Sequence, residues 1–394
     1  MFKKMRVCFV SSSLYDIGGQ QRVVSQIANS LSEKENLEIT LAFTNPKQQK
    51  SEFPYQIHKN ISLIWDERLI RKKNKYIFSK MYRTLYKKNM IKSNPSSALK
   101  YIFSKNERKH YESFFRDHKY DVIIGVGPQN AALLGLLQID GKKIGWLHNT
   151  FERYFETPND YLWNQGPVYS LAFSGLNELV VLTKKAKSTY KKFVNTDVVN
   201  IYNPVTIPYS TNQNKVPNKI IFVGRIFYTT KGLDKLLDSI AILTKMTNQF
   251  SVDIVGDGPD MSKFKDDVKS KELGSFVNII GATNEVSEYY NKAEISVLPS
   301  TIEGFGLVVV EAMASKLPVI SFKTEGPSEI INDGVNGYLI ENFDTEEFAR
   351  KIYSLLTNKQ LLEEMSHNAY LRSKDFSVSK TADNWIDLIK SKKE

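Results

Sequence analysis

The sequence lacks the features that would place it outside a reducing compartment or within a membrane. It has a single cysteine among 394 residues, Cys8, so no disulfide can form within the chain. Cys8 lies in an apolar, strand-like stretch, which predicts an inert core residue. No run of about eighteen uncharged apolar residues occurs, and the N-terminus has no signal-peptide architecture. These absences favour a cytoplasmic protein.

Motifs for two common kinds of cofactor are also missing. The Gly-x-Gly-x-x-Gly fingerprint of dinucleotide binding is absent after the first predicted strand, and Gly18-Gly19 does not supply it, which disfavours an oxidoreductase. No Asp-x-Asp motif stands at a strand end. Four histidines have no metal-ligand spacing among them: His58, His110, His118 and His367. We therefore expect no metal cofactor.

The length predicts two domains, because 394 residues exceed the size at which a single core stops growing. Strand and helix patterns alternate along the chain, as parallel α/β sheets require. A polar, proline-containing stretch from Ile201 to Asn218 interrupts this alternation and predicts a linker. We predict an N-terminal Rossmann-like domain at residues 1–202, a C-terminal one at 203–378 and a final helix at 379–394.

Positive charge is concentrated in one segment of the first domain. Between Arg68 and Lys109 there are fourteen Lys or Arg and one acidic residue, Glu107, so this segment carries +13 while the whole chain carries +11. Apolar residues are threaded among these cations: Ile70, Tyr76, Ile77, Phe78, Met81, Tyr82, Leu85, Tyr86, Met90 and Ile91. This pattern predicts an amphipathic basic helix or a pair of helices.

Three kinds of partner fit such a basic surface. An anionic membrane would attract it, with each Lys or Arg near the lipid worth about 1 kcal/mol. Nucleic acid would be drawn by the same field, but no recognisable nucleic-acid module accompanies the segment. The third interpretation is a solvated helical face with no partner. The sequence favours the anionic membrane surface at 68–109.

Two carboxylates frame a glycine-rich helix start in the second domain. The segment reads Glu303-Gly304-Phe305-Gly306-Leu307-Val308-Val309-Val310-Glu311. A helix beginning near Phe305 would present unpaired N–H groups and its positive dipole end to a phosphate. Glu303 would then face a sugar while Glu311 reaches ribose hydroxyls. The plainer interpretation is that Glu303 only caps the helix and Glu311 is solvated.

Two cations follow an earlier strand of the same domain. Gly224-Arg225 ends this strand, and Lys231 is expected at the start of the next helix. The planar fork of Arg and the point charge of Lys could together hold a diphosphate without a metal. The alternatives are a surface cation for Arg225 and a helix-start residue for Lys231. Gly256 and Gly258 flank Asp257 in a predicted tight turn that would support the site.

These blocks, taken in order, resemble those of glycosyltransferase family 4, the retaining nucleotide-sugar enzymes with the GT-B fold. The shared blocks are Val223-Gly224-Arg225, Lys231-Gly232, Val255-Gly256-Asp257-Gly258-Pro259, the Glu-x7-Glu signature from Glu303 to Glu311, and Pro318-Val319-Ile320. The resemblance covers nearly the whole chain, more tightly from Ile201 onward. It implies two Rossmann-like, doubly wound parallel-sheet α/β domains facing a central cleft, with the last helix crossing back onto the first domain.

The resemblance also implies a set of site residues. The donor-binding residues would be Gly18, Gly19, Gly224, Arg225, Lys231, Glu303, Gly304, Phe305, Gly306, Leu307 and Glu311. The catalytic residues would be Glu303, His148, Arg225 and Lys231. Gln20 and Gln21 stand where many relatives carry Ala-Glu, so the contacts next to the Gly18-Gly19 loop differ. His148 follows a predicted strand; a lone histidine is otherwise more often a hydrogen-bonded structural residue.

The implied reaction moves a hexose or N-acetylhexosamine from a nucleotide diphosphate sugar to an acceptor hydroxyl, with retention and without a metal. A UDP-sugar is favoured over a GDP-sugar. By analogy the acceptor is a lipid-linked saccharide in cell-surface polysaccharide synthesis, met by a peripheral protein at the inner face of the membrane. Two alternatives remain: a nucleotide-sugar 2-epimerase on the same architecture, and a non-catalytic regulatory subunit, which would need no such set of charged residues.

Overall fold

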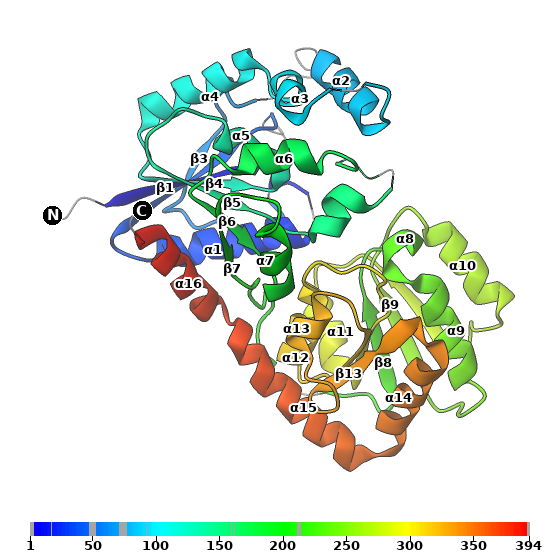
Figure 1. The fold of residues 1–394 in the computed structure, drawn as a ribbon. Helices are drawn as coiled ribbons and strands as arrows, with labels where there is room; N and C mark the ends of the chain where they lie inside the picture. Colours follow the sequence, from blue (N-terminus) through cyan, green and yellow to red (C-terminus); the bar gives the residue numbers. More distant parts are fainter. Residues whose placement is uncertain are drawn as a thin grey trace. The chain divides into compact units, whose positions relative to one another are not determined.

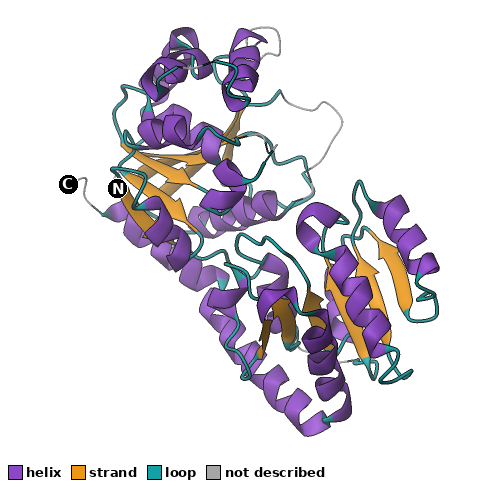
Figure 2. Ribbon diagram, turned by 45° about the vertical axis from the view of Figure 1, so that its right-hand side comes forward, coloured by secondary structure: helices purple, strands orange, loops and turns teal. Residues whose placement is uncertain are grey.

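The computed structural model describes residues 4–16, 18–46, 53–70, 77–91, 93–158, 160, 162–210 and 214–391. The chain divides into two compact units: unit 1 holds Met1–Tyr202 and Val378–Glu394, and unit 2 holds Asn203–Ser377. The ranges predicted from the sequence place the second boundary one residue later. Figures 1 and 2 show that each unit has its own sheet with helices around it.

Unit 1 is built on a sheet of seven strands in the order β3-β2-β1-β4-β5-β6-β7. All the pairings are parallel. The strands are β1 (Met5–Ser11), β2 (Leu37–Phe43), β3 (Ser62–Ile64), β4 (Val122–Val126), β5 (Lys142–Trp146), β6 (Glu178–Val181) and β7 (Asp197–Asn200). The order runs outward in both directions from β1 and β4, so unit 1 is a doubly wound sheet, as predicted.

The helices of unit 1 cover both faces of this sheet. In Figure 1, α5 and α6 lie on one side of the sheet, and α1 and α16 lie on the other. The helices are α1 (Gly19–Ser32), α2 (Ile77–Lys87), α3 (Pro95–Ile102), α4 (Lys105–His118), α5 (Pro128–Gly135), η2 (Glu152–Glu156), α6 (Gly166–Phe173), α7 (Lys184–Tyr190) and α16 (Val378–Lys390).

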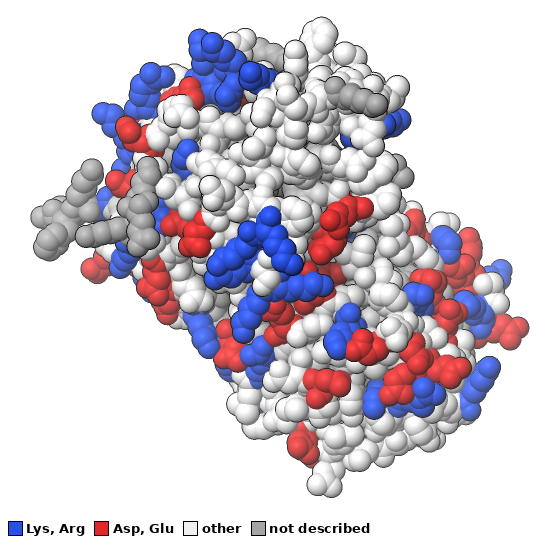
Figure 3. Space-filling model, viewed as in Figure 1, with Lys and Arg blue, Asp and Glu red and all other residues white. Residues whose placement is uncertain are grey.

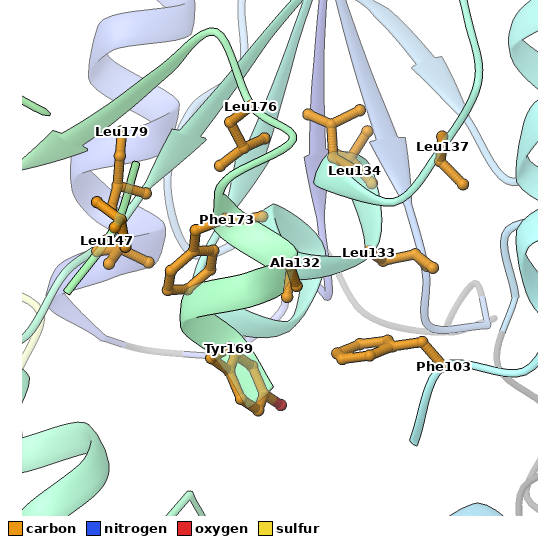
Figure 4. Close-up of a cluster of buried hydrophobic side chains, with 14 of the residues drawn as sticks. Phe103, Ala132, Leu133, Leu134, Leu137, Leu147, Tyr169, Phe173, Leu176 and Leu179 are labelled. Atoms are coloured by element: carbon orange, nitrogen blue, oxygen red, sulfur yellow. The ribbon is translucent and has the colours of Figure 1, made fainter. Parts of the chain in front are cut away.

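The core of unit 1 is apolar and closely packed. Figure 4 shows Leu133 and Leu134 of α5 near Tyr169 and Phe173 of α6, and all four side chains are buried. Cys8 is also buried, in β1, and burial raises the pKa of its thiol. The thiol is therefore a poor nucleophile, which confirms the prediction of an inert core residue.

Unit 2 repeats this architecture with six strands in the order β10-β9-β8-β11-β12-β13, again all parallel. The strands are β8 (Lys219–Val223), β9 (Ser251–Val255), β10 (Val277–Gly281), β11 (Ile295–Leu298), β12 (Val319–Phe322) and β13 (Gly337–Ile340). The helices are α8 (Tyr228–Lys231), α9 (Leu233–Leu243), α10 (Met261–Ser270), α11 (Val286–Lys292), α12 (Leu307–Ala314), α13 (Pro327–Ile330), η3 (Glu341–Phe343), α14 (Thr345–Thr357), α15 (Lys359–Ser373) and η4 (Lys374–Phe376).

The basic segment forms α2, α3 and the first turns of α4. Residues 71–76 and 92 of this segment lie outside the described residues. Ser79 Oγ of α2 donates to Ile102 O at 2.7 Å, and the rings of Tyr82 and Tyr101 stack at 4.7 Å, so α2 rests on α3. A pair of helices was one of the two predictions. No helix formed by the described residues is long and apolar enough to cross a bilayer.

The C-terminal helix α16 is anchored to unit 1 by an aromatic contact and a buried charge. Trp385 is fully buried, with its ring 4.7 Å from that of Trp146. Lys142 Nζ pairs with Glu178 Oε1 at 2.8 Å and donates to Leu388 O at 2.6 Å and Ser391 Oγ at 2.7 Å. A cation at the last carbonyl groups of a helix satisfies them and complements the helix dipole.

Replacing Lys142 with methionine should lower the free energy of unfolding by about 3 kcal/mol, because Glu178 would remain buried without its cation. Denaturant unfolding measures this change. Lys184→Met is the matched control, since Lys184 is exposed and should change stability by less than about 0.5 kcal/mol. Equal effects of the two substitutions would contradict an anchoring role for Lys142.

Candidate functional site

The residues predicted for the site in unit 2 lie in the segments that follow two neighbouring strands of the sheet, β8 and β11. The strand order reverses between β8 and β11, which are neighbours. In open α/β sheets, ligands bind at the carboxyl ends of the strands where the order reverses. The segment after β8 carries Gly224 and Arg225 in a loop and Lys231 at the end of α8, and the loop after β11 leads to Glu303 and α12. The topology therefore brings these two segments together.

Gly232 allows the segments after β8 and β11 to pack in close contact. Its φ is +56°, and a Cβ at this position would lie 2.0 Å from Pro299 O, in the segment that follows β11. Thr301 N donates to Thr230 O at 3.0 Å. A residue with a side chain fits neither the backbone conformation nor the space. This close approach places Lys231, the neighbour of Gly232, beside the loop after β11.

Lys231 and Glu303 form an ion pair as a result. Lys231 Nζ donates to Glu303 Oε2 at 2.7 Å, and the two side chains are 21% and 15% exposed. Partial burial reduces solvent screening, so this pair is held more firmly than a surface pair. Lys231 ends the short helix α8, which corrects the prediction that it begins the next helix; Gly232 separates α8 from α9.

The N-terminus of α12 has no side-chain cap. The helix begins at Leu307 rather than near Phe305, and its N-cap residue Gly306 has φ +91° and ψ +58°. No acidic residue lies in the first turn. The interpretation of Glu303 as a mere helix cap is therefore wrong. An N-terminus of this kind offers backbone N–H groups and a positive dipole end to an anion.

Glu311 lies in the second turn of α12 and is 2% exposed. The interpretation of Glu311 as a solvated side chain is therefore wrong. Its Oε1 accepts a hydrogen bond from the hydroxyl of Thr206, which is also buried. A buried carboxylate needs such donors, because desolvation without them costs several kcal/mol.

Arg225 is exposed, with its guanidinium carbon 5.7 Å from the ring centre of Phe227. The strand end before it is held in place, because Gly224 N donates to Val255 O at 3.0 Å. A Cβ at Gly256, whose φ is +144°, would lie 1.9 Å from Gly224 O. The glycine after β9 thus has the supporting role that was predicted, and Arg225 extends from a fixed backbone.

In unit 1, the Gly18-Gly19 loop follows β1, which neighbours β4 where this sheet reverses. Gly18 is the N-cap of α1 and provides no side-chain cap. Gly18 N donates to Tyr55 Oη at 3.1 Å, and a Cβ at Gly18 would lie 2.6 Å from Gln21 Oε1. The N-terminus of α1 therefore has the same uncapped character as that of α12.

His148 follows β5, and both its ring nitrogens are buried without a hydrogen-bond partner in the described part of the chain. Its backbone N–H donates to Tyr154 Oη at 3.3 Å, and its ring lies 4.6 Å from that of Trp146. Desolvation lowers the pKa of His148 to about 3, so the imidazole is neutral at physiological pH. Two unpartnered nitrogens do not fit the hydrogen-bonded structural histidine that was the alternative.

Two features of the structure were not predicted from the sequence: the role of Thr206 and a second basic surface. Thr206 gave no signal, because it pairs with a residue 105 positions away. A second basic surface surrounds α7 and could have been found by counting charges; Figure 3 shows basic side chains gathered there. Its lysines are Lys184, Lys185, Lys187, Lys191 and Lys192.

The described residues contain no group of three or more His, Cys, Asp or Glu side chains that could hold a metal ion. The predicted site residues fall into two sets. Arg225, Lys231, the Glu303–Leu307 segment and Glu311 belong to unit 2, where Lys231 and Glu303 are in contact, while Gly18, Gly19 and His148 belong to unit 1.

Solved structures share this fold over their whole length. The structure of a mutant of Staphylococcus aureus TarM in complex with Fondaparinux, alpha-GlcNAc-glycerol and UDP matches with a TM-score of 0.75. The match covers 98% of this chain and 100% of that chain at 16% identity. The two doubly wound parallel-sheet units therefore define a GT-B fold, as predicted.

The sequence comparisons identify the family. Residues 206–372 match the family described as glycosyl transferases group 1. An uncharacterized glycosyltransferase of Haemophilus influenzae is 32% identical over 263 residues, which cover 65% of this chain and 72% of that protein. The poly(ribitol-phosphate) alpha-N-acetylglucosaminyltransferase of Staphylococcus aureus is 26% identical over 72% of this chain and 58% of its own length. The chain belongs to the group 1 glycosyl transferases.

The depressed pKa of His148 predicts a pH-dependent stability. Between pH 6.5 and about 3 the unfolded chain binds a proton at His148 that the folded chain does not, so stability falls as the pH falls. At pH 5 the loss should be on the order of 1–2 kcal/mol. His148→Phe removes the titrating group and should lose less stability than the wild type between pH 7.5 and pH 5 in denaturant unfolding. Parallel losses in both proteins would show that His148 is not buried in its neutral form.

Proposed function

We propose that this chain is a retaining glycosyltransferase that transfers a hexose or N-acetylhexosamine from a nucleoside diphosphate sugar to an acceptor hydroxyl. The observation that carries the proposal is the Lys231–Glu303 pair beside the uncapped N-terminus of α12. A cation and oriented N–H groups suit a diphosphate leaving group, and a carboxylate suits sugar hydroxyls. The alternative of a regulatory subunit has no use for this combination.

The leaving group is stabilised by charges and dipoles. Breaking the bond between the anomeric carbon and the phosphate oxygen produces an oxocarbenium-like sugar and a nucleoside diphosphate. Arg225 and Lys231 neutralise the diphosphate, and the backbone N–H groups of Gly304–Leu307 bind its oxygens. Gly18 and Gly19 add the loop before α1. We infer that these groups suffice without a metal ion.

The remaining polar residues orient the reactants. Glu303 accepts hydrogen bonds from the donor sugar hydroxyls, and Glu311 accepts them from the ribose. His148 is neutral, so it donates a hydrogen bond to a sugar hydroxyl instead of supplying a positive charge. The acceptor oxygen bonds to the anomeric carbon on the face that the phosphate leaves, and its proton passes to the released phosphate oxygen. This course retains the anomeric configuration.

A UDP-sugar is the favoured donor. The TarM structure contains UDP, which supports this choice for a chain of the same fold. The proposed acceptor is a lipid-linked saccharide used in cell-surface polysaccharide synthesis. The S. aureus relative named for poly(ribitol-phosphate) supports a surface-polymer role.

Substitutions of the two partners of the ion pair should change nucleotide affinity differently. Lys231→Ala should weaken binding of UDP or GDP, whichever the wild type binds more tightly, by about tenfold or more, because a charge-assisted hydrogen bond to phosphate is lost. Glu303→Gln should bind that nucleotide at least as tightly as the wild type, because Lys231 no longer has to break an ion pair before it binds phosphate. The turnover of Glu303→Gln should fall. Calorimetry and hydrolysis of a panel of nucleotide sugars measure the two effects.

Lys271→Ala is the matched control, because it breaks an exposed ion pair with Asp238 in the same unit and should alter neither quantity. Unchanged nucleotide affinity and turnover in Lys231→Ala would overturn the assignment of the site.

We further propose that α2, α3 and the start of α4 form a surface that binds the inner face of an anionic membrane. No residue of α2 is buried, although the helix is strongly amphipathic in sequence. Large apolar side chains are exposed on this surface: Ile77 at 58%, Phe78 at 80%, Met81 at 52%, Met90 at 68% and Tyr101 at 60%. Lysines stand between them, and Figure 3 shows basic side chains gathered at the top of the view. Exposed apolar and basic residues together suit a lipid surface.

Co-sedimentation with vesicles containing phosphatidylserine tests this surface. The double variant Phe78→Ser and Met81→Ser and the charge variant Lys80→Ser, Lys87→Ser and Lys88→Ser should each pellet at least several-fold less than the wild type. Lys184→Ser, Lys191→Ser and Lys192→Ser form the matched control, because they remove as many charges from the surface around α7. If this control reduced pelleting equally, general electrostatics would explain the binding and the assignment to α2–α4 would fail.

A further inference from the structure

The hydrogen bond between Thr206 and Glu311 points to a residue that acts on the nucleotide without touching it. We propose that Thr206 is a positioning residue that sets the recognition of the ribose by holding the Glu311 carboxylate in place. This inference rests on the proposed function, in which Glu311 binds the ribose hydroxyls. Thr206 lies near the start of unit 2, about a hundred residues before α12 in the sequence.

The segment that carries Thr206 is fixed to unit 2 on both sides. Val205 N donates to Phe376 O at 2.7 Å, and Ser210 N donates to Ala314 O, at the end of α12, at 3.2 Å. Thr206 is 7% exposed, and its β-branched side chain has few accessible rotamers. Its hydroxyl is therefore held in one place relative to α12.

Glu311 needs such a donor because the helix around it is apolar. Its neighbours Val309, Val310, Ala312 and Met313 are fully buried. A hydrogen bond to one oxygen of a long, flexible carboxylate side chain restricts the rotamers that it adopts. The donor on Oε1 restrains the position of the carboxylate, and with it the direction in which Glu311 accepts further hydrogen bonds.

Hydrogen bonds from ribose hydroxyls depend on that direction, because they weaken steeply when misaligned. A binding group is effective only when neighbouring residues hold it in the productive geometry. Loss of the Thr206 hydroxyl should therefore reduce the contribution of the ribose hydroxyls and leave the diphosphate contacts unchanged. This selective loss distinguishes positioning from a general structural role.

The experiment compares two ligands on the full chain: the more tightly bound of UDP and GDP, and its 2′,3′-dideoxy counterpart. The wild type should prefer the ribose form by about tenfold or more, as expected for hydrogen bonds to a charged group. Thr206→Val is nearly isosteric and should bring the two affinities within about threefold. Thr206→Ser keeps the hydroxyl and should restore the preference. Should the valine variant fail to fold, Thr206→Ala removes the same hydroxyl without adding bulk.

Two further variants separate the possible failures. Glu311→Ala should abolish the ribose preference, and Lys231→Ala should weaken both ligands while keeping their ratio. If Glu311→Ala lost the preference but the Thr206 variants kept it, the positioning role would be overturned and the proposed function would stand. A preference unchanged by Glu311→Ala, or absent from the wild type, would overturn the role of Glu311 itself and the inference with it.

Discussion

The close approach of Gly232 to Pro299 is the constraint on which the site in unit 2 depends. It joins the loop after β8 to the segment after β11 at the point where the strand order reverses, and only glycine permits it. Because Lys231 is the neighbour of this glycine, its side chain lies beside the segment after β11 and pairs with Glu303. The site is thus a consequence of backbone packing, with the charged side chains added to a scaffold that fixes their separation.

Three charged side chains of this site have polar partners within unit 2. Lys231 is paired with Glu303, and Glu311 accepts a hydrogen bond from Thr206, so each of these three charged groups has a polar partner. In the proposed function, a bound diphosphate would replace Glu303 as the anionic partner of Lys231, and the released carboxylate would accept hydrogen bonds from the sugar. Such an exchange would couple recognition of the phosphate to recognition of the sugar, in accord with the need to stabilise the transition state more than the ground state.

The sequence predicted the fold class and most of the strands, because buried parallel strands read as short apolar runs. It missed β3, β7 and β13, which all lie at sheet edges and are partly exposed, so their sequences lack such runs. In the candidate site, motif order led to the prediction of Arg225, Lys231, Glu303 and Glu311, and the structure pairs Lys231 with Glu303. The burial of Glu311 and its bond to Thr206 could not be predicted, because they depend on two segments distant in sequence.

A crystal structure of the chain bound to UDP or GDP would show whether the site in unit 2 holds the diphosphate. We expect diphosphate oxygens within hydrogen-bond distance of Lys231 Nζ, the Arg225 guanidinium and the first N–H groups of α12, with the Lys231–Glu303 pair opened. A nucleotide bound elsewhere on the molecule, with that pair still closed, would contradict this expectation.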